Sequence, residues 1–234
     1  MPLFEKINYY RTVLTNDYVK YVDKIEAKNI VREMAGDLVQ CTSLIRILQN
    51  PDDVYESDLN VNHIIKSAHG CGWNISIEDK TTVESVKQSL YLWNHQYTDT
   101  NEVQYSYIEP RFFIEEKVDD SILGKTGDAI VYLIRCIHGK PFVIGVRTKT
   151  GQNNYDLNWN PIKRIEVPNV EKPKQLEKMI EIAKRLSKQF EFVRIDLYIG
   201  KDNLIYFSEF TFTPSGGNMF YSMKREKEFG KLWK

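Results

Sequence analysis

The chain has 234 residues, 42% of them hydrophobic, and its 32 Lys plus Arg balance its 32 Asp plus Glu. This length can bury a sizeable core and form one domain of two lobes. The charge balance gives no electrostatic case for nucleic acid or an anionic membrane as the main partner. Three widely spaced cysteines and the lack of a run of 18 apolar residues predict a cytoplasmic protein without membrane insertion.

The first predicted elements lie in the N-terminal half. Residues 23–34 are predicted to form a helix, which a glycine ends. Residues 62–77 indicate a strand that runs into Lys66, a loop with Gly70 and Gly72, and a second strand. Glycines beside a lysine suit a loop whose backbone N–H groups wrap phosphate, but a glycine-containing hairpin turn predicts the same residues.

The middle of the chain is predicted to hold a helix, a loop and a strand. Residues 82–94 carry apolar residues on one stripe, which indicates a helix. Residues 95–110 are polar and turn-rich and predict a loop. Residues 111–118 are an apolar strand ending in paired acids. Backbone groups of such a strand end could hold adenine and a carboxylate the ribose, although a solvated strand end predicts the same residues.

The C-terminal third begins with the clearest helical pattern. Residues 174–190 have apolar residues at helical spacing and lysines elsewhere, so the apolar face is predicted to be core. Residues 192–199 and 204–212 are rich in Val, Ile, Tyr, Phe and Thr. The turn at residues 200–203 joins them, and the whole predicts an antiparallel hairpin.

This hairpin carries the most informative pair of acids, Asp196 and Glu209. Adjacent antiparallel strands can bring both carboxylates to one face of a sheet, where two hard oxygen ligands suit Mg²⁺ and leave positions open for phosphate oxygens. Arg194 precedes Asp196 by two residues, so the strand period places its guanidinium on the same face. A carboxylate beside a fixed cation suggests phosphoryl chemistry. An edge-strand salt bridge is the alternative interpretation.

In the order of these parts the chain resembles the ATP-grasp superfamily and, within it, the TupA-like branch named for teichuronopeptide biosynthesis. The matching stretches are VDKIEAKNIVREM, IIKSAHGCG, EPRFFIEEKV, NNYDLNWNPI and FVRIDLYIGKDNLIYFSEFTFTP. They cover most of residues 20–217 in the family's order, and the last is the most specific. The NNYDLNWNPI block itself is compatible with a substrate-facing loop or with a packed turn.

The resemblance implies an α+β ATP-grasp fold in which two α+β lobes with antiparallel sheets enclose the nucleotide. Residues 1–234 would be one ATP-grasp domain, with the phosphate loop in an N-terminal lobe of about residues 20–115. The metal site would lie in a C-terminal lobe of about residues 116–234. Only about twenty residues precede Asp23, too few for a domain, so the α/β domain that commonly precedes this fold is expected to be absent or vestigial.

The resemblance also implies roles for single residues. The positions that match nucleotide-binding residues are Lys28, Lys66, His69, Gly70, Gly72, Glu115, Glu116, Lys117, Val118, Asp119 and Asp120. Within this set the lysines at 28 and 66 would contact phosphates, Glu115 would be the acid of the adenine pocket, residues 116–118 the hinge, and Asp119 or Asp120 a ribose ligand.

The implied metal ligands are Asp196, Glu209 and Thr211, the last at a position where many ATP-grasp enzymes carry asparagine. Two residues are implied to be catalytic. Lys66 would hold the phosphates, and Arg194 resembles the arginine that steadies the transferred phosphoryl group.

One stretch departs from the TupA-like pattern. Where the family usually has Asp-Tyr-Lys, this chain has Val-Tyr-Leu at residues 131–133, so one acid and one base are missing from the central sheet. Asp128, Arg135 and Arg147 lie near enough in the sequence to replace them.

The resemblance implies an ATP- and Mg²⁺-dependent carboxylate-amine ligase that forms an amide through an acyl phosphate, in surface polysaccharide or glycopolymer biosynthesis. Its substrates would be small-molecule or glycan carboxylates and amines. Two alternatives stay open. The first is a kinase of a sugar or other small hydroxyl substrate, because the same fold type supports kinases. The second is a catalytically degenerate nucleotide-binding protein, which the missing acid and base favour.

Overall fold

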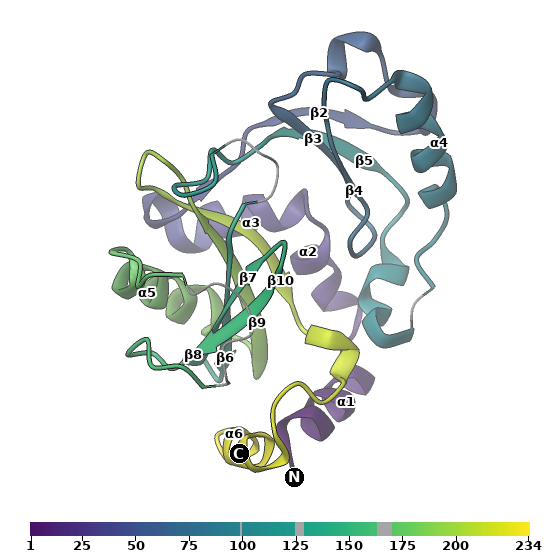
Figure 1. The fold of residues 1–234 in the computed structure, drawn as a ribbon. Coiled ribbons are helices and arrows are strands. Elements are labelled where there is room, and N and C mark those ends of the chain that lie inside the picture. The colour runs from purple at the N-terminus through teal and green to yellow at the C-terminus, as the bar shows by residue number, and fades with distance from the viewer. Residues whose placement is uncertain (99, 125–128, 163–169) are drawn as a thin grey trace.

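The computed structural model describes residues 1–98, 100–124, 129–162 and 170–234, and it contains two β-sheets, one above the other in Figure 1. The helices are α1 (Leu3–Val13), α2 (Val19–Val22), α3 (Glu26–Ala35), α4 (Val83–Trp93), α5 (Leu176–Ser187) and α6 (Met223–Gly230). The strands are β1 (Gln40–Cys41), β2 (Leu44–Leu48), β3 (His63–Ser67), β4 (Asn74–Ser76), β5 (Phe112–Glu116), β6 (Val131–Ile137), β7 (Lys140–Thr148), β8 (Gly151–Tyr155), β9 (Phe192–Ile199) and β10 (Ile205–Thr211).

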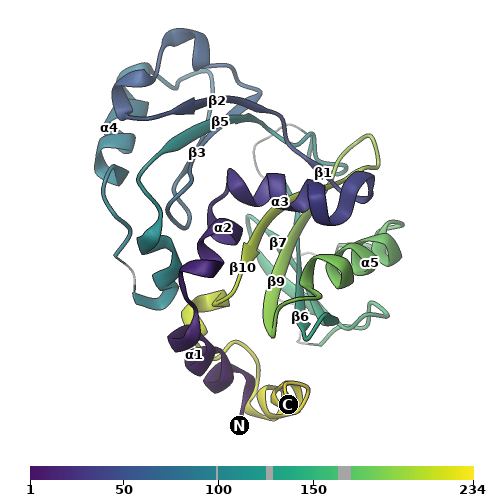
Figure 2. The same ribbon diagram turned by 180° about the vertical axis from the view of Figure 1, so that it is seen from behind.

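The larger sheet has six strands in the order β1-β10-β9-β6-β7-β8. All neighbours are antiparallel except β1, which runs parallel to β10. Helices α3 and α5 pack against one face of this sheet, as Figure 2 shows, and bury the main hydrophobic core against it. The apolar stripe of α5, including Met179 and Leu186, lies in this core, so it is core as predicted.

The smaller sheet has four antiparallel strands in the order β2-β5-β3-β4. Helix α4 covers one face, where Val86 and Leu90 pack against Leu48 and Phe112 in a separate hydrophobic cluster. The opposite face of the sheet looks toward the larger sheet. Two lobes with antiparallel sheets confirm the predicted α+β fold class.

Local hydrogen bonds set the helix boundaries. Helix α3 begins at Glu26, three residues later than predicted, and in the turn before it the carboxylate of Asp23 accepts hydrogen bonds from the N–H groups of Ile25 and Glu26. Thr82 caps α4, with its hydroxyl accepting a hydrogen bond from the N–H of Ser85. The predicted loop at residues 95–110 differs from expectation, since Thr100–Tyr107 forms 3₁₀ turns.

Elements from the N-terminal part of the chain belong to both sheets. Strand β1 joins the larger sheet through β10, and α3 packs on that sheet's helix layer. The smaller sheet is built from β2 to β5. Beyond the sheets, α1 and α6 pack against each other, which brings the two chain ends side by side in Figures 1 and 2. Among the described helices, none has the length and apolarity needed to cross a membrane.

Candidate active site

A cleft of about 650 Å³ lies between the two sheets and takes side chains from both. Among its lining residues, lysines and arginines outnumber glutamates by eight to four, although the whole chain is electrically balanced. A cleft lined by an excess of one charge concentrates ligands of the opposite charge. The cleft is therefore suited to a polyanion.

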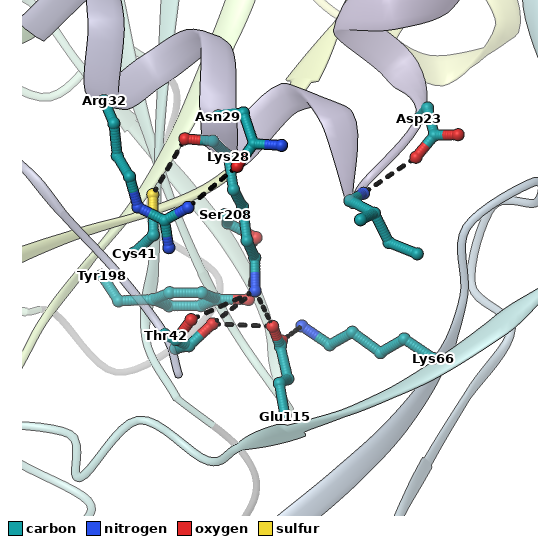
Figure 3. Close-up of polar contacts among 11 residues, drawn as sticks. Asp23, Lys28, Asn29, Arg32, Cys41, Thr42, Lys66, Glu115, Tyr198 and Ser208 are labelled. Carbon is teal, nitrogen blue, oxygen red and sulfur yellow. Dashed lines mark hydrogen bonds and ion pairs between the residues drawn. The ribbon is translucent and has the colours of Figure 1, made fainter. Parts of the chain in front are cut away.

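On the small-sheet side, Glu115 lies between Lys28 and Lys66 (Figure 3). One carboxylate oxygen is 2.6 Å from the Nζ of Lys66, and the other accepts from Lys28 and, at 2.7 Å, from the hydroxyl of Thr42. Strand pairing explains the contact with Lys66, because β3 and β5 are neighbours. Lys28 arrives from α3, which packs on the other sheet. We refer to Lys28, Glu115 and Lys66 as the lysine triad.

The lysine triad is electrostatically coupled. Burial favours the neutral form of Glu115, but the two lysines outweigh it and lower its pKa to about 2. Burial also opposes the charge of Lys66, yet Glu115 outweighs it and raises the pKa of Lys66. For Lys28 burial prevails and lowers the pKa. Both oxygens of Glu115 are occupied by lysines, so this acid positions the two cations, whereas its predicted adenine contact stays a prediction.

The sequence interpretation missed several residues that line the cleft, among them Lys24 and Glu102. Lys24 lines the cleft, donates to the carbonyl oxygen of Gly70 and lies 4.9 Å from the centre of the Tyr105 ring. Its signal was its position four residues before Lys28, which places both on one side of the chain entering α3. Glu102 lines the cleft from the segment predicted to be a plain loop, and burial raises its pKa. No sequence signal distinguished it.

The predicted phosphate loop joins β3 to β4. Gly72 lines the cleft with φ of +72°, a backbone conformation that favours glycine. Gly70 is required for packing, because a Cβ there would come within 2.4 Å of the Trp73 ring. His69 is fully buried outside the cleft lining; its Nε2–H donates to the carbonyl of Trp93 and its Nδ1 accepts from the N–H of Arg111. His69 therefore holds the loop in place and presents no atom to the cleft.

The predicted hinge follows β5 and also lines the cleft at Glu116, Lys117 and Val118. The N–H groups of Glu116 and Lys117 already donate to the carbonyls of Ser43 and Asn62, and the Lys117 ammonium donates to Ile77 at 2.7 Å. These N–H groups hold the hinge to the smaller sheet.

The two candidate ribose ligands differ in availability. Both carboxylate oxygens of Asp120 accept backbone hydrogen bonds, from Ile122, Leu123 and Ile130, so this buried acid shapes its own turn. Asp119 is 38% exposed on its side chain and lies 3.5 Å from the Nζ of Lys201. Of the two, only Asp119 has a carboxylate that faces an open surface.

On the large-sheet side, β9 and β10 form the predicted hairpin, in which Asp196 is the register partner of Glu209 and Arg194 that of Thr211. Arg194 donates two hydrogen bonds of 2.6 Å to Asp196 and lies 3.4 Å from Glu209. We refer to Arg194, Asp196 and Glu209 as the arginine triad. Because β9 lies between β10 and β6, this is an interior strand, and the edge-strand interpretation does not apply.

The described residues of the hairpin fit a magnesium ion. Burial raises the pKa of Asp196 to about 6 in spite of Arg194, whereas burial of Glu209 is outweighed by Lys24 and Arg194, which lower its pKa. The hydroxyl of Thr211 is buried, and within the described part of the chain it has no hydrogen-bond partner. Two carboxylates and a free hydroxyl are hard oxygen donors of the kind Mg²⁺ takes.

No group of three or more His, Cys, Asp or Glu side chains with metal-binding geometry occurs among the described residues. A site built on two carboxylates leaves coordination positions open for waters and for phosphate oxygens.

Two of the three residues predicted to replace the missing acid and base lie in the cleft. Arg135 on β6 and Arg147 on β7 both line the cleft. Arg147 lies 4.0 Å from Asp196, and Arg135 is the register partner of Arg194. Asp128 lies outside the described residues. Two arginines thus stand on the sheet face where the family pattern has an acid and a base.

Solved structures of similar fold were found. A D-alanine–D-alanine ligase from Bacillus anthracis complexed with ATP is 16% identical, with a TM-score of 0.54 over 90% of this chain and 60% of that one. An N5-carboxyaminoimidazole ribonucleotide synthetase complexed with ADP is 12% identical, with a TM-score of 0.52 over 90% and 51%. An L-amino acid ligase from Bacillus licheniformis is 12% identical, with a TM-score of 0.52 over 85% and 44%.

The chain thus spans 44–60% of the length of these three structures, which share its fold. No curated protein matches the sequence. A family model described as "TupA-like ATPgrasp" matches residues 5–234, nearly the whole chain. The chain therefore belongs to the TupA-like ATP-grasp family.

Proposed function

We propose that this protein is an ATP- and Mg²⁺-dependent ligase that joins a carboxylate to an amine through an acyl phosphate, in surface polysaccharide or glycopolymer biosynthesis. The observation that carries the proposal is the pairing of two unlike triads across one cleft. The lysine triad presents two cations for each acid, and the arginine triad presents two acids for each cation. Nucleotide phosphates would suit the first and a divalent cation the second.

The proposed reaction has two steps. A carboxylate oxygen of the acid substrate forms a bond to the γ-phosphorus of ATP while the bond from that phosphorus to the bridging oxygen breaks, which releases ADP. The nitrogen of the amine then attacks the acyl carbon, the carbon–oxygen bond to phosphate breaks, and a proton leaves the nitrogen as the amide forms. The protein contributes positioning and charge stabilisation to both steps.

Residues of this chain would supply that positioning. Lys28 and Lys66 would contact the phosphates, and Arg194 would stabilise charge on the transferred group. Asp196, Glu209 and Thr211 would hold Mg²⁺, which neutralises phosphate charge when bound. Each oxygen of Asp196 accepts one hydrogen bond from Arg194 and keeps a further lone pair that could face the ion.

The names of the three similar structures support the reaction class, since two of those proteins are ligases of amino acids and two were solved with ATP or ADP. For the acid substrate we propose an acidic sugar or a glutamate unit, and for the amine an amino acid or a simple amine. These substrates follow the family resemblance to teichuronopeptide biosynthesis.

Hydroxylamine trapping tests the proposal. The protein is incubated with ATP, Mg²⁺ and hydroxylamine together with glutamate, glucuronate or galacturonate, and ADP and hydroxamate are both measured. We expect one acid to give hydroxamate and ADP in equal amounts, and the Glu209→Gln variant to give neither. ADP release with phosphate fixed on a hydroxyl would identify a kinase instead, and binding of Mg·ATP without any ADP release would leave the degenerate nucleotide-binding alternative.

A further inference from the structure

Arg135 is a buried cation whose charge is unpaired in this structure. Its side chain is only 3% exposed, it forms no salt bridge within the described part of the chain, and its Nη1 has no hydrogen-bond partner there. A buried charge without a counterion is costly. A buried charge of this kind is expected where a ligand of opposite charge supplies the counterion.

Two aromatic rings hold Arg135 in place. The guanidinium carbon lies 5.2 Å from the ring centre of Phe220 and 5.5 Å from that of Tyr221. Rings in these positions attract the guanidinium through its charge, and its Nη1 has no acceptor among the described residues. The side chain is thus oriented by packing rather than by an acid.

The acids that act on Arg135 are engaged elsewhere. Asp196 accepts both of its close hydrogen bonds from Arg194. Glu226 is buried, and its oxygens accept from the backbone N–H groups of Phe4, Phe220 and Tyr221, so it fixes the segment that carries the two rings. Neither acid neutralises Arg135, and burial lowers the pKa of its guanidinium.

The position of Arg135 along β6 separates it from the proposed nucleotide. Val131 lines the hinge end of the cleft, and Arg135 is four residues farther along the strand, about 14 Å at 3.4 Å per residue. Between them, Leu133 is the register partner of Asp196, which is in turn the partner of Glu209. The two metal-binding carboxylates therefore lie between the hinge and Arg135.

We propose that Arg135 anchors a carboxylate of the acid substrate, beyond the magnesium site as seen from the hinge. A guanidinium held by its faces offers parallel N–H groups along an edge, which match the two oxygens of a carboxylate. This inference rests on the proposed function for the direction in which the nucleotide lies. It adds that the acid substrate carries a carboxylate bound by Arg135, in a subsite separate from the lysine triad.

Calorimetry on Arg135→Gln and Arg135→Lys tests this assignment, with the exposed Arg225→Gln on α6 as a matched control. Sodium glutamate and sodium glucuronate are titrated into each protein with and without Mg·ADP, and Mg·ADP and Mg·ATP are titrated separately. We expect at least one of the two acids to bind the wild-type protein. Arg135→Gln should weaken that acid at least tenfold, whereas Arg135→Lys, which keeps the charge but loses the planar fork, should have a smaller effect. Nucleotide affinities should stay within twofold, and Arg225→Gln should match the wild type throughout.

Three results would overturn the assignment. One is equal acid binding by wild type and Arg135→Gln, and another is no binding of either acid to the wild type. The third is a loss of ATP affinity without a loss of ADP affinity in Arg135→Gln, which would place the guanidinium on the γ-phosphate. Melting temperatures of all variants identify a folding defect. If Arg135→Gln has one, the acid affinity of Arg135→Lys is compared with that of the wild type instead. Failure of the proposed function would show differently, as an absence of hydroxamate in the trapping assay while acid binding still depended on Arg135.

Discussion

The triads on the two faces of the cleft carry excess charge of opposite sign, although both are built from acidic and basic side chains. In the lysine triad one buried acid holds two cations, and in the arginine triad one buried cation holds two acids. The triads also differ in origin, since the first joins three elements from both lobes and the second lies within one hairpin. In both triads the central member sets the geometry, whereas the excess charge remains available for a ligand.

The largest effect is expected from removing either acid of the arginine triad, in which two carboxylates surround one cation. Asp196→Asn and Glu209→Gln should each lower Mg²⁺-dependent ATP turnover by 100-fold or more, since loss of one metal carboxylate costs roughly 3 kcal/mol or more of transition-state stabilisation. The two variants should differ in stability. Asp196→Asn leaves Arg194 buried without its bidentate partner, so its melting temperature should fall, whereas Glu209→Gln should melt near the wild type.

Turnover assays and thermal melts on both variants check this pair of expectations. Near-normal turnover in Glu209→Gln would contradict the metal assignment whatever its stability. An unchanged melting temperature in Asp196→Asn would instead show that the pairing of Asp196 with Arg194 adds little stability. Asp196 and Glu209 would then not differ in their effect on folding.

The two triads also mark how far the sequence could predict the site. Strand β9 has the bounds that were predicted, and the hairpin acids meet because they are close in the chain and share a strand period. Lys28 and Glu115 are 87 residues apart and come from elements that pack in different sheets and helix layers, so no spacing could indicate their contact. The missing partner of Arg135 and the inward position of Glu102 likewise depend on tertiary packing.

The next effect concerns stability, and it tests the central acid of the lysine triad. Glu115 has a pKa of about 2 in the folded protein against an ordinary value of 4.5, a difference that corresponds to about 3 kcal/mol. Because the folded-state pKa is the lower one, this stability is fully present above pH 4.5 and is lost as the pH falls toward 2. Glu115→Gln should be destabilised by about 3 kcal/mol at pH 7 and should lose less stability than the wild type between pH 5 and pH 3.

Urea unfolding across this pH range measures both quantities. The neighbouring Glu116→Gln, whose side chain is exposed, is the matched control and should follow the wild type. Parallel curves for wild type and Glu115→Gln would mean that the carboxylate is not the group that joins the two lysines.

A smaller effect is expected from removing one excess cation. Lys66→Met should weaken ATP by roughly 10- to 30-fold, about 1.5 to 2 kcal/mol, while adenosine binding changes little, because only ATP presents phosphate charge to the ammonium. Calorimetric titration of both ligands into Lys66→Met and into the exposed control Lys80→Met provides the comparison. Equal losses for ATP and adenosine would point to a folding defect and would remove the phosphate role from Lys66.

The smallest effect is expected at Thr211, which borders the arginine triad. Its hydroxyl is buried and, among the described residues, unpartnered, so in the metal-free protein it contributes no hydrogen bond and bears a desolvation cost. Thr211→Val keeps the shape and removes that cost, so the free energy of unfolding without metal should be unchanged or higher by a few tenths of a kcal/mol. With Mg·ADP the same variant should gain less stabilisation than the wild type, because the oxygen is missing where a ligand to the ion is expected. Melting curves with and without Mg·ADP separate the stability of the metal-free protein from the stabilisation that Mg·ADP adds. A variant that is less stable without metal, or one that gains as much from Mg·ADP as the wild type, would rule out Thr211 as a metal ligand and leave the two carboxylates of the hairpin as its ion site.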